Sequence, residues 1–161
     1  FPKWQAEERA VTSDAPAAPT GILTTTFQPQ MVRDVTQVSS ASKLRSAQIV
    51  DARAAARFRG EVPEPRKGLR SGHIPNARSM PFTDLLNDDQ TLKSPDQTRA
   101  LFEAAGVDLS KPIITSCGSG VTAAVLGLAL ERMGHNDWSL YDGSWTEWGM
   151  FPTVPVATGE A

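Results

Sequence analysis

Cys117 is the single cysteine of the 161-residue chain, and its neighbours make it a candidate nucleophile. It opens the segment Cys-Gly-Ser-Gly-Val-Thr at 117–122, between an apolar run at 112–116 and a predicted helix. Glycines at a strand-to-helix junction let the backbone curl, so that successive N–H groups and the positive end of the helix can face the sulfur. Such donors lower the pKa of a thiol and favour the thiolate. A buried structural cysteine is the alternative, but the flanking glycines favour the nucleophile.

The residues after Cys117 disfavour a phosphatase. A phosphate-binding loop of the tyrosine-phosphatase kind needs an arginine six residues after the cysteine, and Ala123 stands there. Segment 117–122 contains no Lys or Arg, so an anionic substrate must be bound by basic residues from another segment. Residues 61–72 form a long charged stretch with Pro and Gly, and a loop of that length is usually functional or disordered. We expect this stretch to supply the basic residues.

Strand and helix patterns alternate along the chain, which predicts an α/β fold with a parallel sheet and helices on both of its faces. Short apolar runs indicate strands, and apolar residues at every third or fourth position indicate helices. The expected elements are an extended segment at 22–27, strands at 48–52, 112–116 and 139–142, helices at 34–44, 95–105 and 121–134, and a helical turn at 54–59.

Two helices carry more detailed signals. Ser94 and Gln97 form a capping box around Pro95 at the first helical position, so a helix begins there, and Gly106 ends it. In the helix after the cysteine, four apolar residues are expected to share one face. These are Val121, Ala124, Val125 and Leu128.

Composition excludes several classes of protein. Sixteen Lys and Arg against eighteen Asp and Glu give a formal net charge of −2, which argues against a nucleic-acid partner. No apolar run approaches the roughly 18 residues of a membrane span, so no membrane partner is expected. One cysteine with two histidines, His73 and His135, excludes an intrachain disulfide and a multi-thiolate or multi-histidine metal site. We therefore expect no metal and no other cofactor.

Four segments together resemble the rhodanese family of sulfurtransferases, and within it the 3-mercaptopyruvate sulfurtransferase branch. They are Val-Asp-Ala-Arg at 50–53, Gly-His-Ile-Pro-Asn-Ala at 72–77, the cysteine segment at 117–122 and Tyr-Asp-Gly-Ser-Trp at 141–145. They occur in the family's order and cover roughly residues 22–150. The resemblance implies a rhodanese-like parallel sheet.

The resemblance also implies a reaction. Cys117 takes sulfur from 3-mercaptopyruvate as a persulfide, pyruvate leaves, and a thiol acceptor such as thioredoxin, or cyanide, removes the outer sulfur. Arg57 and Arg66 match the family's arginines for the carboxylate and carbonyl of the substrate, a role that suits a planar guanidinium. Ser119 matches a serine of a Ser–His–Asp relay, with a hydroxyl that only bonds the backbone as the alternative. The substrate-binding loop would comprise Gly118, Gly120, Val121 and Thr122.

Family members carry two such domains in tandem, and only the second bears the reactive cysteine. The opening Phe-Pro-Lys-Trp resembles the Trp-Thr-Glu-Trp at 145–148, so residues 1–21 are expected to be the tail of a preceding rhodanese domain with its linker. Residues 22–161 would be the catalytic domain. The relay's His and Asp belong to the preceding domain in the family. His73 looks like a structural turn residue and His135 like an exposed loop residue, so the preceding domain is an expected partner.

Two other functions stay open at this stage. One is a thiosulfate sulfurtransferase, and the other is a non-catalytic rhodanese-like interaction module. Trp138, Trp145 and Trp148 are expected to pack at the sheet edge and the interface with the preceding domain. A single reduced cysteine fits a reducing compartment, so the cytoplasm is expected, with the mitochondrial matrix as the eukaryotic alternative.

Overall fold

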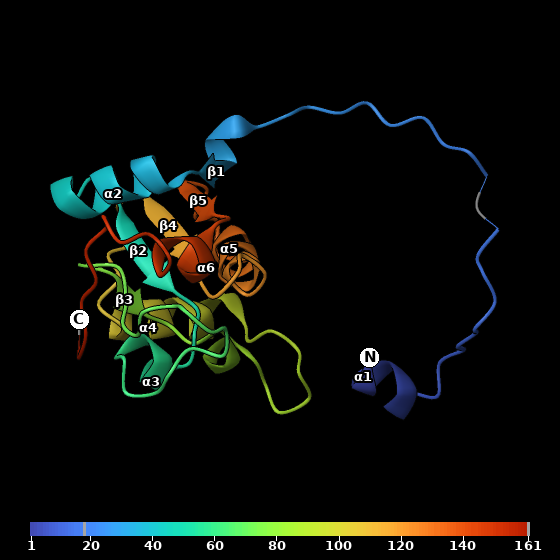
Figure 1. Ribbon diagram of the computed structural model, residues 1–161. Helices are drawn as coiled ribbons and strands as arrows, with labels where there is room; N and C mark the ends of the chain where they lie inside the picture. Colours follow the sequence, from blue (N-terminus) through green and yellow to red (C-terminus); the bar gives the residue numbers. More distant parts are fainter. Residues whose placement is uncertain (18, 161) are drawn as a thin grey trace.

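The computed structural model describes residues 1–17 and 19–160 and centres on a five-stranded, all-parallel sheet (Figure 1). The strand order is β1-β5-β4-β2-β3, which places the strand that precedes Cys117 in the middle of the sheet. The strands are β1 Val32–Arg33, β2 Gln48–Asp51, β3 Arg78–Ser79, β4 Ile113–Ser116 and β5 Trp138–Tyr141.

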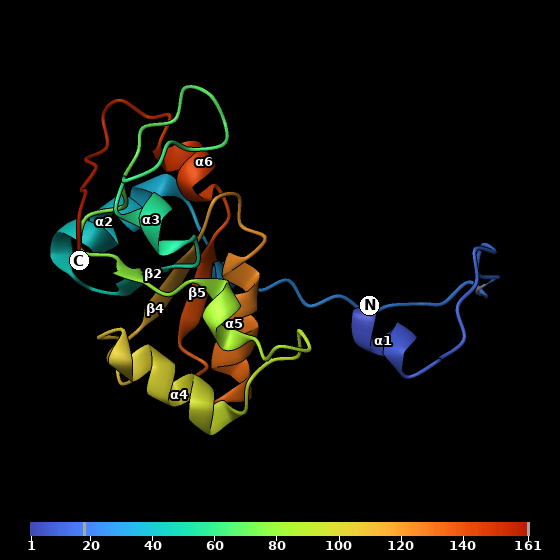
Figure 2. The same ribbon diagram turned by 90° about the horizontal axis from the view of Figure 1, so that it is seen from below.

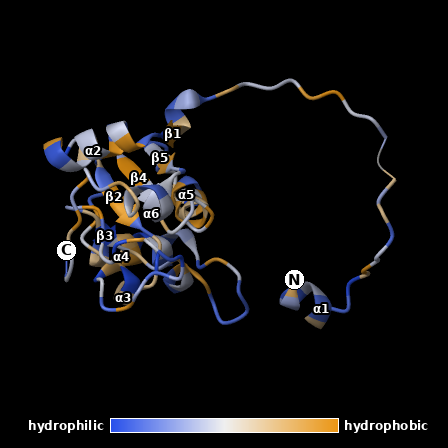
Figure 3. Cartoon of the chain, in the orientation of Figure 1, coloured by the Kyte–Doolittle hydropathy of each residue, from blue (hydrophilic) through white to orange (hydrophobic). Residues whose placement is uncertain are grey.

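Helices cover both faces of this sheet, as predicted (Figure 2). Helices α2 (Val35–Leu44), α3 (Ala55–Phe58) and α6 (Ser144–Trp148) lie on one face, and α4 (Pro95–Ala104) and α5 (Ala123–Arg132) on the other. Each face has its own buried apolar cluster. Apolar colouring marks the central strands β2 and β4 and also helix α5 (Figure 3).

The predicted beginning and end of helix α4 are confirmed. The Ser94 hydroxyl accepts a hydrogen bond from the N–H of Gln97 at 3.3 Å, and the Gln97 side chain accepts one from the N–H of Ser94 at 3.0 Å. Gly106 follows with φ of +76°, the left-handed conformation that glycine adopts without steric cost. Both ends of the helix are therefore set by neighbouring residues.

The predicted buried face of α5 is wrong. Val121 and Leu128 are 73% and 52% exposed, whereas Ala123, Leu126 and Gly127 are buried against the sheet. The buried residues Ala123, Leu126 and Leu130 are also apolar and helically spaced, so the apolar pattern alone does not select one side of this helix. The close approach of Trp138 is possible only on the side that carries Gly127, because a Cβ added there would lie 2.3 Å from the indole ring.

Several short elements escaped prediction because they are only two to five residues long. They are β1, β3, α6 and two 3₁₀ turns at Pro29–Met31 and Phe82–Leu85. Residues 22–27, expected as an extended segment, belong to no strand, and Ile22 and Phe27 are 98% and 85% exposed. A short helix α1 (Pro2–Ala6) precedes this stretch and lies apart from the sheet (Figure 1).

Candidate active site

Cys117 lies at the carboxyl end of β4, the central strand, and directly before α5. Its side chain is 1% exposed. Ligand crevices of parallel α/β sheets lie beyond the carboxyl ends of the strands. The strand–loop–helix setting predicted for the cysteine is therefore confirmed.

Four hydrogen-bond donors surround the Cys117 sulfur. The Ser119 N–H lies 3.4 Å from Sγ, and the Thr122 hydroxyl and the N–H groups of Thr122 and Ala123 also donate to it. Burial on its own raises the pKa of a thiol, but these donors outweigh burial and lower the pKa of Cys117. The last two N–H groups belong to the start of α5, where the helix dipole favours negative charge. The site therefore favours a thiolate.

Ser144 positions the cysteine loop, a role that sequence reasoning missed. Its hydroxyl accepts the N–H groups of Cys117 and Gly120, each at 3.1 Å, and donates to the carbonyl of Tyr141 at 2.8 Å. The Gly120 N–H was expected to face the sulfur and instead binds this hydroxyl. Gly120 has φ of +82°, and a Cβ there would lie 2.9 Å from Asp142 Oδ1. This glycine is needed for close approach of the two loops.

The carbonyl groups of the cysteine loop point toward α6. The Trp145 N–H donates to the Cys117 carbonyl at 2.9 Å. The Gly118 carbonyl accepts both the N–H of Thr146, at 2.9 Å, and its hydroxyl, at 2.6 Å. The loop is therefore held by α6 on its carbonyl side, while N–H groups on its other side reach the sulfur.

A pocket of about 200 Å³ adjoins the cysteine loop. It brings together Arg57, Arg66, Gly118 and Ser119, four of the residues proposed from sequence. The other proposed loop residues do not line this pocket: Thr122 donates to the sulfur, Gly120 is buried, and Val121 is exposed. The full lining is Arg57, Glu64, Pro65, Arg66, Leu69, Gly118, Ser119 and Thr146.

Glu64 is a buried acid in this wall that sequence reasoning missed. Its side chain is 1% exposed and pairs with Arg57, Nη2 to Oε2 at 2.5 Å, and with Arg53, Nη1 to Oε1 at 2.9 Å. Arg53 also pairs with Asp51 at 2.7 Å and lies over the Trp145 ring at 4.3 Å. Alternating charges thus run from the end of β2 to the pocket and neutralise one another. The charge pattern of 61–72 gave no sign that this acid would be buried.

Arg66 and Ser119 are both exposed at the lining of this pocket. Arg66 is exposed and donates a hydrogen bond from Nη1 to the Thr146 hydroxyl. The Ser119 side chain is exposed, and its hydroxyl makes no hydrogen bond within residues 1–17 and 19–160. The alternative that this hydroxyl bonds the backbone is therefore not seen. Arg66 keeps donors for an anionic ligand.

The two histidines and the tryptophans near the C-terminus lie in structural contacts away from this pocket. The His73 Nδ1 lies 2.9 Å from the Phe58 carbonyl, and its ring stacks on the Phe58 ring at 3.8 Å between centroids. His135 was expected to be exposed, yet it is half-buried, with Nε2 3.0 Å from the Asp137 carbonyl of its own loop. Trp145 and Trp148 were expected at an edge or an interface, and instead they are fully buried in the core.

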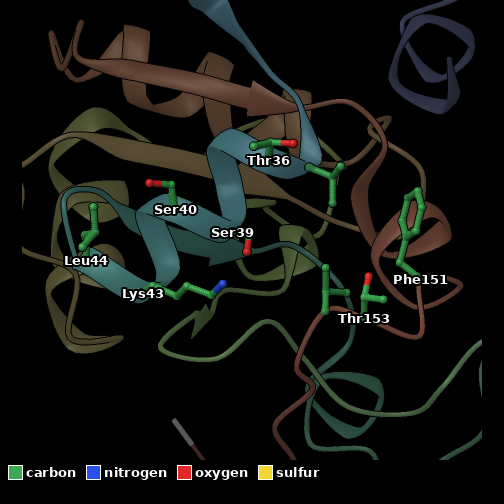
Figure 4. A pocket seen from close by; sticks show the side chains of 9 residues that line it. Thr36, Ser39, Ser40, Lys43, Leu44, Phe151 and Thr153 are labelled. Atoms are coloured by element: carbon green, nitrogen blue, oxygen red, sulfur yellow. The ribbon is translucent and has the colours of Figure 1, made fainter.

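Another pocket, of about 530 Å³, lies between α2 and residues 151–154 (Figure 4). Hydroxyl, aliphatic and aromatic side chains line it, with Lys43 as its charged member. Among the described residues, no group of three or more His, Cys, Asp or Glu could hold a metal ion. No helix in residues 1–17 and 19–160 is long and apolar enough to cross a membrane.

A central parallel sheet, with a glycine-flanked cysteine loop beyond the carboxyl end of its middle strand, defines the class of this domain. The family model of the rhodanese-like domain matches residues 34–150, and the chain belongs to the rhodanese family.

Individual sulfurtransferases and one solved structure are similar to this chain over nearly its whole length. The chain is 48% identical to 3-mercaptopyruvate sulfurtransferase of Escherichia coli, over 95% of this chain and 54% of that protein. It is 41% identical to thiosulfate sulfurtransferase of Bos taurus, over 98% of this chain and 53% of that protein. The crystal structure of the Tum1 protein from Saccharomyces cerevisiae matches with a TM-score of 0.85 and 31% identity, over 100% of this chain and 59% of that chain. This chain thus spans about half the length of the curated relatives it matches.

Proposed function

We propose that this chain is the sulfur-carrying half of a 3-mercaptopyruvate sulfurtransferase. The observation that carries the proposal is one pocket of about 200 Å³ in which two arginines adjoin the loop of a thiolate-favouring cysteine. The 48% identity to an enzyme of that name supports the same substrate.

In the first step, the Cys117 thiolate attacks the sulfur of 3-mercaptopyruvate. A sulfur–sulfur bond forms while the carbon–sulfur bond breaks, and its electron pair leaves with the enolate of pyruvate, which a proton then converts to pyruvate. The enzyme keeps a persulfide on Cys117. The N–H groups and the hydroxyl that face the sulfur stabilise negative charge on it, as an oxyanion hole does for oxygen.

The two arginines take different parts in binding this substrate. Glu64 occupies Nε and Nη2 of Arg57, at 3.2 and 2.5 Å, so Arg57 offers its remaining Nη1 donors to the carbonyl. Arg66 is exposed, and within residues 1–17 and 19–160 its side chain is tethered through Nη1 to Thr146. Its free guanidinium edge suits the two oxygens of the carboxylate.

In the second step, the thiolate of an acceptor such as reduced thioredoxin attacks the outer sulfur, and the Cys117 thiolate leaves. Cyanide takes the same sulfur as thiocyanate. Release of pyruvate before the acceptor reacts makes this a ping-pong mechanism.

A preceding rhodanese domain is the partner that completes the site. Residues 1–21 would be its tail and linker, and residues from 22 onward the catalytic domain. This domain would supply the His and Asp of a relay to Ser119, whose hydroxyl is exposed beside the pocket. We also propose a reducing compartment, the cytoplasm, because a single free thiol persists there.

Thiosulfate is the competing donor, since the chain is 41% identical to a protein named for it. The segment after Cys117 holds no Lys or Arg, and a planar guanidinium pair suits a keto acid. A non-catalytic interaction module is disfavoured because such a module needs no thiolate-stabilising donors around its cysteine.

The test measures sulfur transfer to a thiol acceptor from 3-mercaptopyruvate and from thiosulfate, with and without the preceding domain added. We expect preference for 3-mercaptopyruvate, dependence on the added domain, and a loss of roughly 10³-fold or more in Cys117→Ser. Preference for thiosulfate would overturn the donor assignment. An unimpaired Cys117→Ser chain would support the interaction module instead.

A further inference from the structure

The Thr146 hydroxyl lies between the substrate arginine and the cysteine loop. It donates to the Gly118 carbonyl at 2.6 Å and accepts a hydrogen bond from Arg66 Nη1. Each direction is forced, because a carbonyl oxygen can only accept and a guanidinium can only donate. A single hydroxyl therefore connects Arg66 with Gly118, two residues that are 52 positions apart in sequence.

The Gly118–Ser119 peptide carries this connection on to the sulfur. A trans peptide directs its C=O and its N–H to opposite sides, and the described chain contains no cis peptide. With the Gly118 carbonyl turned to Thr146, the Ser119 N–H of the same peptide points at Cys117 Sγ, 3.4 Å away. Thr146 thus sets the plane of the amide that stabilises the thiolate.

The three hydrogen bonds of this series share one donor-to-acceptor direction. Arg66 donates to Thr146, Thr146 donates to the Gly118 carbonyl, and the N–H of the same peptide donates to Cys117 Sγ. Hydrogen bonds in series polarise one another, and a positive charge at the donor end strengthens each of the following donors. The Ser119 N–H is therefore a better donor to sulfur while Arg66 holds Thr146.

We propose that Thr146 is a positioning residue that couples carboxylate recognition at Arg66 to the orientation of the amide facing Cys117. The part of this proposal that concerns carboxylate recognition at Arg66 rests on the proposed function, whereas the part that concerns the amide facing Cys117 does not. The backbone N–H of Thr146 also binds the Gly118 carbonyl, at 2.9 Å, so removing the hydroxyl leaves the loop anchored.

The first experiment follows the rate of Cys117 alkylation by iodoacetamide against pH in Thr146→Val, Thr146→Ser and the unsubstituted chain. Valine keeps the shape and removes the hydroxyl, and serine keeps the hydroxyl. We expect the alkylation midpoint to rise by roughly 0.5 to 1 pH unit in Thr146→Val and to stay in place in Thr146→Ser. The proposal is overturned if the pH profile of alkylation in Thr146→Val coincides with that of the unsubstituted chain. It is also overturned if the midpoint in Thr146→Ser shifts as far as the midpoint in Thr146→Val. Thr146→Ala replaces Thr146→Val if thermal unfolding shows the latter to be misfolded.

A second experiment addresses Arg66 through protection of Cys117 from alkylation by pyruvate, which keeps the carboxylate and carbonyl of the substrate. Half-protection should require several-fold more pyruvate in Thr146→Val than in Thr146→Ser. In an Arg66→Ala background, the same Val substitution should have no further effect on protection. Equal protection of the Val and Ser variants overturns the coupling to Arg66.

Failure of the coupling and failure of the proposed function give different results. A chain that transfers sulfur from neither donor but shows the Val-specific shift refutes the function and supports the coupling to Cys117. A chain that prefers 3-mercaptopyruvate but has superimposable Val and Ser profiles supports the function and refutes the coupling.

Discussion

Glu64 holds Arg57 in a two-point ion pair, Nη2 to Oε2 at 2.5 Å and Nε to Oε1 at 3.2 Å. The acid is 1% exposed and the arginine 27%, so the pair spans the boundary between core and pocket. The buried carboxylate fixes which edge of the guanidinium is left for a ligand. It also balances the charge of Arg53, which is buried beside it.

Removal of this acid should destabilise the fold. Glu64→Gln leaves the buried Arg53 with one carboxylate partner in place of two, so we expect the free energy of unfolding to fall by about 3 kcal/mol. The matched control is Glu61→Gln, which breaks a surface pair with Arg59 at 2.7 Å and should leave the free energy of unfolding almost unchanged, because solvent screens an exposed pair. Urea unfolding measures both. Equal losses in the two variants would contradict the structural role assigned to Glu64.

Gly120→Ala tests the close packing of the two loops at the site. An added Cβ would meet Asp142 Oδ1 at 2.9 Å and the Asp142 carbonyl oxygen at 3.0 Å, with φ at +82°. We expect a loss of about 2–3 kcal/mol in stability, together with impaired sulfur transfer. Gly134→Ala is the control, because its φ is +78° but nothing lies within 4 Å of the added Cβ. It should cost about 1 kcal/mol, and a loss as large as that of Gly120→Ala would rule out crowding as the cause.

The lowered pKa of Cys117 predicts a specific pH dependence. Alkylation of the folded chain should reach its midpoint at a lower pH than alkylation of the unfolded chain, because the donors around the sulfur outweigh burial and lower the pKa of Cys117. Over the interval between the folded and unfolded pKa values, the unfolded chain holds more protons. The free energy of unfolding should therefore rise with pH there and lose this contribution as pH falls. The same chain in guanidinium chloride is the reference, and a folded midpoint at or above it would refute the thiolate assignment.

His73 should make the fold sensitive to acid. Burial lowers the pKa of this histidine, although its hydrogen bond to the Phe58 carbonyl opposes the shift. Below about pH 6.5, His73 binds a proton in the unfolded chain but stays neutral in the folded chain. The free energy of unfolding should therefore decrease as the pH is lowered, until the pH reaches the pKa of folded His73. Urea unfolding between pH 7.5 and 5 should show this slope in the unsubstituted chain and in His135→Gln. Persistence of the full slope in His73→Gln would assign it to other groups.

Much of the sheet and the position of the nucleophile could be predicted from local patterns. The capping box at Ser94, the apolar runs of the three longer strands and the glycines around Cys117 each act through neighbours in sequence. Elements such as β3, two residues long, have no such pattern, because their strand geometry comes from pairing with β2.

The sequence by itself determined the family, the candidate nucleophile Cys117 and the arginines that line the pocket, because these depend on residue types at fixed spacings. Only the tertiary structure decided which face of α5 is buried, since apolar residues lie on more than one side of this helix and the close approach of Trp138 requires the side that carries Gly127. It also revealed the burial of Glu64 and the contacts of Ser144 and Thr146 with the cysteine loop. Glu64 pairs with arginines 7 and 11 positions away in sequence, and Ser144 and Thr146 reach loop residues 27 and 28 positions away. Contacts over that range depend on how the packed chain brings separate loops together at one edge of the sheet.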